Sequence, residues 1–60
     1  MTDPIIAQLK RIQGQVSGVI TMYESDRECV DVVRQIIAIR NSLTSVAREM
    51  FTTEAHRCSA

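Results

Sequence analysis

The sequence contains few residues of several types: no tryptophan, one tyrosine, one phenylalanine, one proline, two glycines and two cysteines among 60 residues. Lysine plus arginine and aspartate plus glutamate number seven each, so the net charge is zero. The overall basic field that favours nucleic-acid binding is therefore absent, although a local basic patch is compatible with this balance. No apolar run exceeds four residues, which predicts no membrane span. No basic-then-apolar leader opens the chain, so we expect a cytoplasmic protein with reduced thiols.

Sequence motifs of catalysis are also missing. The chain has no Gly-rich phosphate loop, no pair of catalytic carboxylates and no Ser/His/Asp set, and we expect no enzymatic activity. It has no helix-turn-helix pattern and no zinc-finger spacing. What the chain does have is a high apolar content, 45% of its residues. A chain this short buries too little of that surface alone, so the composition predicts self-association.

The beginning of the chain carries the signals of a helix start. Thr2 or Asp3 can cap a helix, and Pro4 suits the first helical position. Apolar residues then recur in alternating steps of four and three, at Ile5, Leu9, Ile12, Val16, Val19 and Tyr23. This spacing is typical of a helix that packs along a neighbouring helix. We therefore predict a first helix over residues 4–24.

Two glycines interrupt this first helix. Gly14 and Gly18 each cost about 1 kcal/mol relative to alanine in a helix interior, so we expect another backbone to approach there. The only polar break follows at Glu24, Ser25 and Asp26. Ser25 and Glu28 have the spacing of a capping box, which predicts a second helix over residues 26–58.

The apolar pattern of the second helix suggests the assembly. One broad stripe contains Val32, Val33, Ile36, Ile39, Leu43, Val46, Ala47, Met50 and Phe51. We predict an all-α fold with a single domain over residues 1–60, in which a long helical hairpin pairs with a second copy as an antiparallel four-helix-bundle homodimer.

The two cysteines lie on this second helix, 29 residues apart. At about 100° per residue Cys58 falls about 20° around the axis from Cys29, and roughly 44 Å away along it. They cannot meet within one helix, but each faces the other across an antiparallel dimer whose two-fold axis passes near Leu43 and Thr44. The positive end of the helix dipole lies at Cys29, which makes it the expected nucleophile and Cys58 of the partner the second thiol. The alternative is a small buried Cys29 and a frayed Cys58.

Two further side chains lie near the second thiol in sequence. Glu54 shares the stripe and can act as an oxygen ligand, with a solvated surface carboxylate as the alternative. His56 points away from the thiols on a regular helix, and we expect a surface histidine. The basic residues Lys10, Arg11, Arg40 and Arg48, together with Gln15, are candidates for contact with DNA; taken alone, their pattern favours an ordinary solvated helix surface.

Several segments together resemble the CsoR/RcnR/FrmR family of small all-helical repressors that respond to metals or to thiol chemistry. These segments are Leu9-Lys10-Arg11-Ile12-Gln13-Gly14-Gln15-Val16-Ser17-Gly18, Met22, Cys29-Val30-Asp31-Val32-Val33, Gln35-Ile36 and Ala38-Ile39-Arg40. The resemblance covers about residues 5–58. It implies an antiparallel four-helix-bundle dimer, often paired into a tetramer, that binds operator DNA and releases it when a thiol site between subunits is filled. Lys10 and Arg11 match basic positions used for the operator.

The family's ligand positions are matched unevenly. Cys29 and Cys58 match two cysteine ligands, but the histidine that copper and nickel sensors place four residues before the second cysteine is Glu54 here. Cu(I) prefers thiolate and imidazole to carboxylate. Two thiols without the histidine resemble the persulfide-sensing branch. Family members usually continue into a third helix, whereas this chain stops at Ala60, which leaves dimer and tetramer both open.

Three hypotheses follow from these observations. The first is a repressor that leaves operator DNA when Cys29 and Cys58 of the partner are modified by persulfide or oxidation, with no required cofactor. The second is a repressor whose inducer is Cu(I) or another thiophilic metal, bound by the same cysteines with or without Glu54. The third is a helical interaction module that does not bind DNA.

Overall fold

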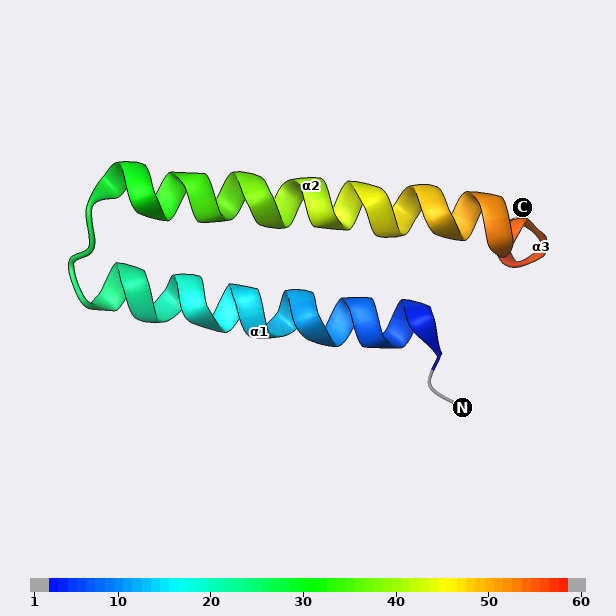
Figure 1. Cartoon of the computed structure of the whole chain (residues 1–60), viewed down its shortest axis with the longest axis horizontal. Helices are drawn as coiled ribbons and strands as arrows, with labels where there is room; N and C mark the ends of the chain where they lie inside the picture. The colour runs from blue at the N-terminus through cyan, green and yellow to red at the C-terminus, as the bar shows by residue number, and fades with distance from the viewer. Residues whose placement is uncertain (1–2, 59–60) are drawn as a thin grey trace.

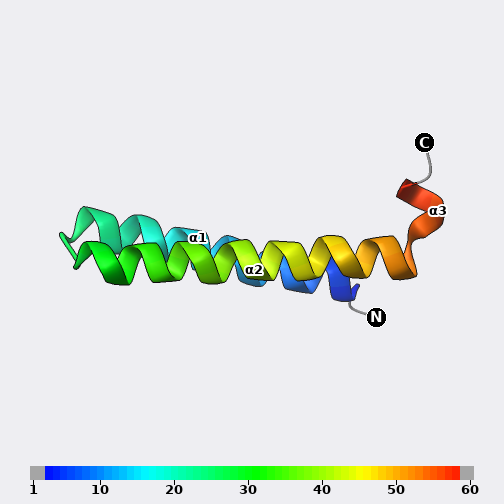
Figure 2. The same cartoon turned by 90° about the horizontal axis from the view of Figure 1, so that it is seen from above.

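The computed structural model describes residues 3–58 and is built from helices. Helix α1 spans Pro4–Glu24, α2 spans Cys29–Thr53, and the short α3 spans Ala55–Cys58. The two long helices lie antiparallel and side by side, and α3 turns away from the axis of α2 (Figures 1 and 2). The predicted all-α hairpin is confirmed. None of the helices described in residues 3–58 has both the length and the apolarity needed to cross a membrane.

Helix α1 begins and ends where the sequence predicts. The Asp3 carboxylate accepts hydrogen bonds from the backbone N–H groups of Ile5, at 2.9 Å, and Ile6, at 3.5 Å. Pro4 follows at the first helical position, where a missing N–H costs nothing. Asp3 is therefore the cap; Thr2, the alternative, lies outside the described residues.

The predicted start of the second helix is wrong by three residues, because Ser25 and Asp26 end α1 instead of starting α2. Asp26 has a φ of 56°, the left-handed conformation. Its N–H donates to the carbonyl of Tyr23 at 3.3 Å, and the next N–H, of Arg27, donates to the carbonyl of Met22 at 3.1 Å. This pair of bonds is a Schellman motif, which satisfies the last carbonyls of a helix. Helix α2 then begins at Cys29 without a side-chain cap.

The predicted end of the second helix at residue 58 is also wrong. Helix α2 ends at Thr53, and Glu54 has φ −131° and ψ 36°, outside the helical region. The hydroxyls of Thr52 and Thr53 donate to the carbonyls of Arg48 and Glu49. Adjacent β-branched residues that bond back to the preceding turn weaken a helix, which favours an end at this point.

The core is a single layer between α1 and α2. Ile5 and Ile12 pack with Ile39 and Val46, and partly buried Val19 and Met50 extend the cluster. The buried residues recur every seven positions, as expected for nearly antiparallel helices. The side chains of Gln8 and Glu49 form a hydrogen bond beside this layer, so residue 8 of α1 lies level with residue 49 of α2.

The expectation that another backbone approaches the two glycines is not met within the hairpin. A Cβ at Gly14 or Gly18 would meet nothing within 4 Å. Helical spacing places Gly14 about 160° from Ile12, on the side facing away from α2, and Gly18 about 100° from Val19, on the flank of α1.

Candidate metal and thiol site

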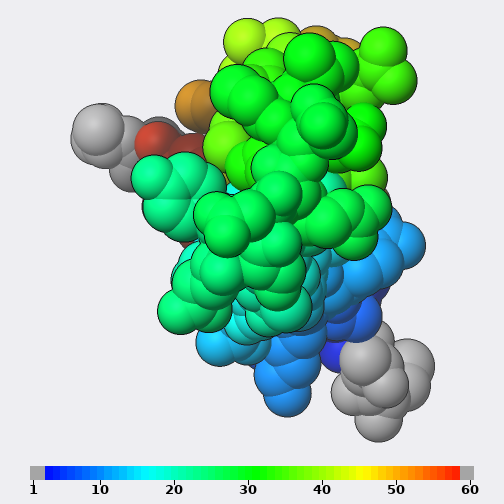
Figure 3. Space-filling model, turned by 90° about the vertical axis from the view of Figure 1, so that its left-hand side faces the viewer, coloured from blue at the N-terminus to red at the C-terminus, as the bar shows by residue number. Residues whose placement is uncertain are grey.

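Cys29 is the first residue of α2 and carries a free, exposed thiol. An open groove of about 440 Å³ lies beside it, lined by Tyr23, Asp26, Arg27, Cys29, Val32, Val33 and Ile36. The groove lies at the loop end of the hairpin, the end that faces the viewer in Figure 3. Its lining is mostly apolar, and the two charged residues come from the loop. The structure thus excludes a small, buried Cys29.

Cys58 is the last residue of α3 and is also free and exposed. It lies at the other end of the molecule, since the 25 residues of α2 separate it from Cys29. At 1.5 Å per residue that helix is about 37 Å long, so the two thiols of one chain cannot bind one ion. Within residues 3–58 of a single chain, no three His, Cys, Asp or Glu side chains cluster closely enough to hold a metal. Any site that uses both thiols requires two chains.

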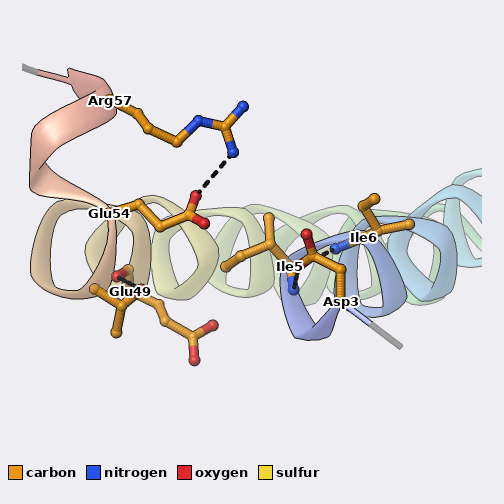
Figure 4. Close-up of polar contacts among 7 residues, drawn as sticks. Asp3, Ile5, Ile6, Glu49, Glu54 and Arg57 are labelled. Atoms are coloured by element: carbon orange, nitrogen blue, oxygen red, sulfur yellow. Dashed lines mark hydrogen bonds and ion pairs between the residues drawn. The ribbon is translucent and has the colours of Figure 1, made fainter. Parts of the chain in front are cut away.

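Glu54 lies at the break between α2 and α3 and does not continue a helical stripe. Its carboxylate Oε2 accepts a hydrogen bond from Nη1 of Arg57 at 3.3 Å, and the two side chains form an ion pair (Figure 4). The Glu54 side chain is 24% exposed, so it is half-buried and not the freely solvated carboxylate of the alternative interpretation. The ion pair holds the carboxylate toward α3, the helix that carries Cys58.

The helix break also changes the reasoning about the residues that follow it. The predicted angles of Glu54 and Cys58 assumed one continuous helix, and that assumption fails after Thr53. His56 is exposed on α3, as a surface histidine should be, but its direction no longer follows from the α2 axis.

The candidate DNA-binding residues are all exposed but do not form one cluster. Lys10 and Arg11 lie in the first half of α1, and Arg48 lies in the second half of α2. Because the Gln8–Glu49 hydrogen bond aligns these two segments, the three basic residues occupy the same end of the hairpin. Gln15 lies one turn further along α1. Arg40 is separate, on α2 between the exposed apolar residues Ile36, Ile37 and Leu43.

Sequence reasoning missed three features of this site. It did not predict the groove, the Schellman motif beneath it or the ion pair at Glu54. The ion pair had a usable signal, since a carboxylate and a guanidinium three residues apart face each other in a helical turn. The groove had no sequence signal, because its shape depends on the path of the loop that connects α1 to α2.

By its fold and its thiols, this chain is a small all-helical protein that exposes one cysteine at each end of a hairpin. Residues 2–60 match the model of the metal-sensitive transcriptional repressor family, and the chain belongs to this family. Its members are regulators of transcription and not enzymes.

Named relatives agree with this assignment. The copper-sensing transcriptional repressor CsoR of Bacillus subtilis is 45% identical over 58 residues, which are 97% of this chain and 57% of that protein. The copper-sensing transcriptional repressor RicR of Mycobacterium tuberculosis is 38% identical over 56 residues, covering 93% of this chain and 58% of that protein. The chain thus spans a little over half the length of both relatives.

A solved structure shares the fold. The copper-sensing operon regulator protein CsoRGz superposes with a TM-score of 0.90 at 33% sequence identity, and the match covers 97% of each chain. The similarity therefore includes both thiol-bearing ends of the hairpin.

Proposed function

We propose that this chain represses transcription from operator DNA and that Cu(I), or another thiophilic metal, releases it. The observation that carries this proposal is the pair of exposed thiols at opposite ends of an all-helical hairpin. An antiparallel homodimer brings Cys29 of one protomer to Cys58 of its partner and creates two equivalent sites. The copper-sensing relatives favour a metal inducer over persulfide, which reverses the order of the first two sequence-based hypotheses.

The residues present suit a soft metal ion. Thiolates prefer Cu(I), and two thiolates from two protomers supply the main ligands. Glu54 stands where a nitrogen ligand is expected, and its carboxylate is a poor ligand for Cu(I) and already engaged by Arg57. We therefore assign Cys29 and Cys58 as the ligands, with Glu54 as a weak third candidate.

Anaerobic titration with Cu(I) in the presence of a competing chelator tests the metal site. We expect one ion per Cys29–Cys58 pair, hence two per dimer, and release of an operator DNA fragment as the sites fill. Cys29→Ser and Cys58→Ser should each abolish both effects, whereas Ser45→Ala, on the exposed surface of α2, should change neither. Tight binding that survives in Cys29→Ser would contradict the proposal.

Persulfide sensing is the second candidate, and the missing nitrogen ligand at Glu54 favours it. The Cys29 thiolate would attack the outer sulfur of a persulfide donor, and the donor would leave as a thiolate. The partner's Cys58 thiolate would then attack the inner sulfur of modified Cys29 and expel hydrosulfide, which leaves a disulfide between protomers. Mass spectrometry after treatment with a persulfide donor should show a crosslinked dimer, and its absence would exclude this candidate.

DNA binding separates both candidates from the third hypothesis, a helical module without a DNA role. We propose that Lys10, Arg11, Gln15 and Arg48 contact the operator; Arg40, the remaining sequence-based candidate, lies among exposed apolar residues of α2 and is left out of this proposal. A failure to bind DNA from the chain's own promoter at low salt would favour the interaction module, because phosphate contacts are strongest there.

A further inference from the structure

Among residues 3–58, the large apolar side chains that remain exposed lie on one side of the hairpin, with Val30 and Ile37 at its edge. Eleven residues form this apolar face: Ile6, Leu9, Val16, Ile20, Tyr23, Val30, Val33, Ile36, Ile37, Leu43 and Phe51. Around each helix they lie roughly 40–160° from the buried residues, in the same rotational direction. Two antiparallel helices that face each other turn this flank to the same side, so the residues form one continuous surface.

The area of this surface indicates what covers it. The accessible surface of the chain is 4987 Å², whereas a compact folded monomer of 6.7 kDa is expected to expose roughly 3,900 Å². The excess is about 1,000 Å², and each partner in a standard protein interface buries about 800 Å². One further copy of the hairpin is therefore enough to bring the exposed surface to a normal value, and we take a second copy as the occupant.

The proposed thiol pairing brings the two copies of α2 together antiparallel, and this step rests on the proposed function. Because α3 turns away after Thr53, the pairing fixes the register only to within about one helical turn. We take the register in which the two-fold axis passes between Leu43 and Thr44, where position 36 faces position 51 of the other chain. Ile36 lines the groove beside Cys29, and Phe51 is 69% exposed on the apolar face.

We propose that Phe51 of one protomer fills the groove beside Cys29 of the other. The groove suits an aromatic side chain because most of its lining is apolar, including Tyr23, Val32, Val33 and Ile36. An aromatic ring buries more apolar area than other side chains and is a common anchor at the centre of an interface. Phe51 is the only phenylalanine of the chain and precedes the α2–α3 break by a few residues, so its docking brings α3 and Cys58 to Cys29.

In this arrangement, Phe51 of each protomer covers one side of the thiol site at Cys29 of the other protomer. The ring closes the open side of the groove and keeps bulk water away from Cys29. Filling the groove and pairing the thiols thus become linked events, because both require the same register of the two chains.

Engineered disulfides test this register without the native thiols. In a background of Cys29→Ser and Cys58→Ser, the double variant Ile36→Cys with Phe51→Cys should form a disulfide-linked dimer under mild oxidation. Each single variant is the matched control, because the two copies of position 36, or of position 51, lie about 22 Å apart along the axis in this register. Crosslinking by a single variant as fast as by the double variant would overturn the proposal, as would no crosslinking by the double variant.

A second measurement covers the case in which the engineered cysteines disturb the interface. In a Cys58→Ser background, Phe51→Ala should raise the dimer dissociation constant by at least about tenfold and should speed alkylation of Cys29. Phe51→Leu should restore slow alkylation in part, and Thr52→Ala, exposed beside it, should behave as the parent. Unchanged dimer affinity and alkylation in Phe51→Ala would overturn the proposal. Neither measurement depends on Cu(I). If the crosslink forms but the metal titration fails, Cu(I) is rejected as the inducer and the position of Phe51 in the groove is retained.

Discussion

Glu54 is the residue that separates this chain from the ligand set its resemblance implies. It occupies the position at which a nitrogen ligand is expected, and it ends α2 while its carboxylate pairs with Arg57. A surface ion pair whose Arg57 side is exposed contributes little stability, so its main effect is to orient the carboxylate. In the proposed site between two chains, the identity of this one side chain would decide between a two-thiol site and a complete soft-metal site.

Replacing Glu54 with histidine should tighten Cu(I) binding by at least about tenfold, or about 1.4 kcal/mol, because imidazole is a better ligand than carboxylate for a soft ion. A competition titration with a Cu(I) chelator measures the change. Glu54→Gln is the control, since it removes the ion pair without adding a soft ligand. Equal affinities in the two variants would show that position 54 does not face the thiols.

At the scale of the elements, local capping signals predicted α1 fully and α2 only in part. Asp3 followed by Pro4 is a pattern that signals only a helix start, and α1 begins at these residues. Ser25 and Glu28 match a capping box, yet the segment is used to end α1, because Asp26 can adopt the left-handed conformation that a Schellman motif needs. The break at Glu54 was not predicted because no glycine or proline, the usual signals of a helix end, lies near it.

Asp26→Gly should raise the free energy of unfolding by about 0.5–1 kcal/mol, because glycine adopts a positive φ without steric cost. Urea unfolding followed by circular dichroism measures this change. Asp26→Ala should gain nothing, since its Cβ keeps the steric cost. If both variants were equally stable, the backbone conformation at this position would not be the cause.

Gly14→Ala and Gly18→Ala should each raise the free energy of unfolding by about 1 kcal/mol, because both glycines are in the interior of α1. A Cβ at either position meets nothing within the hairpin. Thermal unfolding of the two single variants measures the gain. A loss of stability in one of them would reveal that another chain packs against that part of α1.

At the scale of the whole molecule, the sequence predicts a partner, and self-association stays a prediction that a single chain does not test. High apolar content in a short chain favours it, and the exposed apolar face of α1 and α2 is the surface that a second copy would cover. The groove beside Cys29 follows from the three-dimensional path of the loop and could not be derived from residue spacing. The pairing of Cys29 with Cys58 needed only helical geometry and symmetry, and it stays a prediction about the dimer.

The apolar face also divides the basic residues by function. Arg40 lies among its apolar side chains, so a second copy that covers this face removes Arg40 from contact with DNA. Arg11 lies outside the face, and Lys10 lies at its edge, about 160° from Ile12, so both side chains keep contact with solvent on both protomers. We therefore expect the charge of the operator contact to come from the end of the hairpin that carries Lys10, Arg11 and Arg48.

The salt dependence of operator binding tests this division. Lys10→Gln and Arg11→Gln should each reduce the slope of log K against log salt concentration by about two per dimer, because each variant removes one phosphate contact from both protomers. Arg40→Gln and Arg34→Gln are matched controls that remove the same charge from α2 and should leave the slope unchanged. Fluorescence anisotropy with a labelled operator at several salt concentrations gives these slopes. If all four variants lowered the slope equally, the protein would bind DNA through its total charge and not through this end of the hairpin.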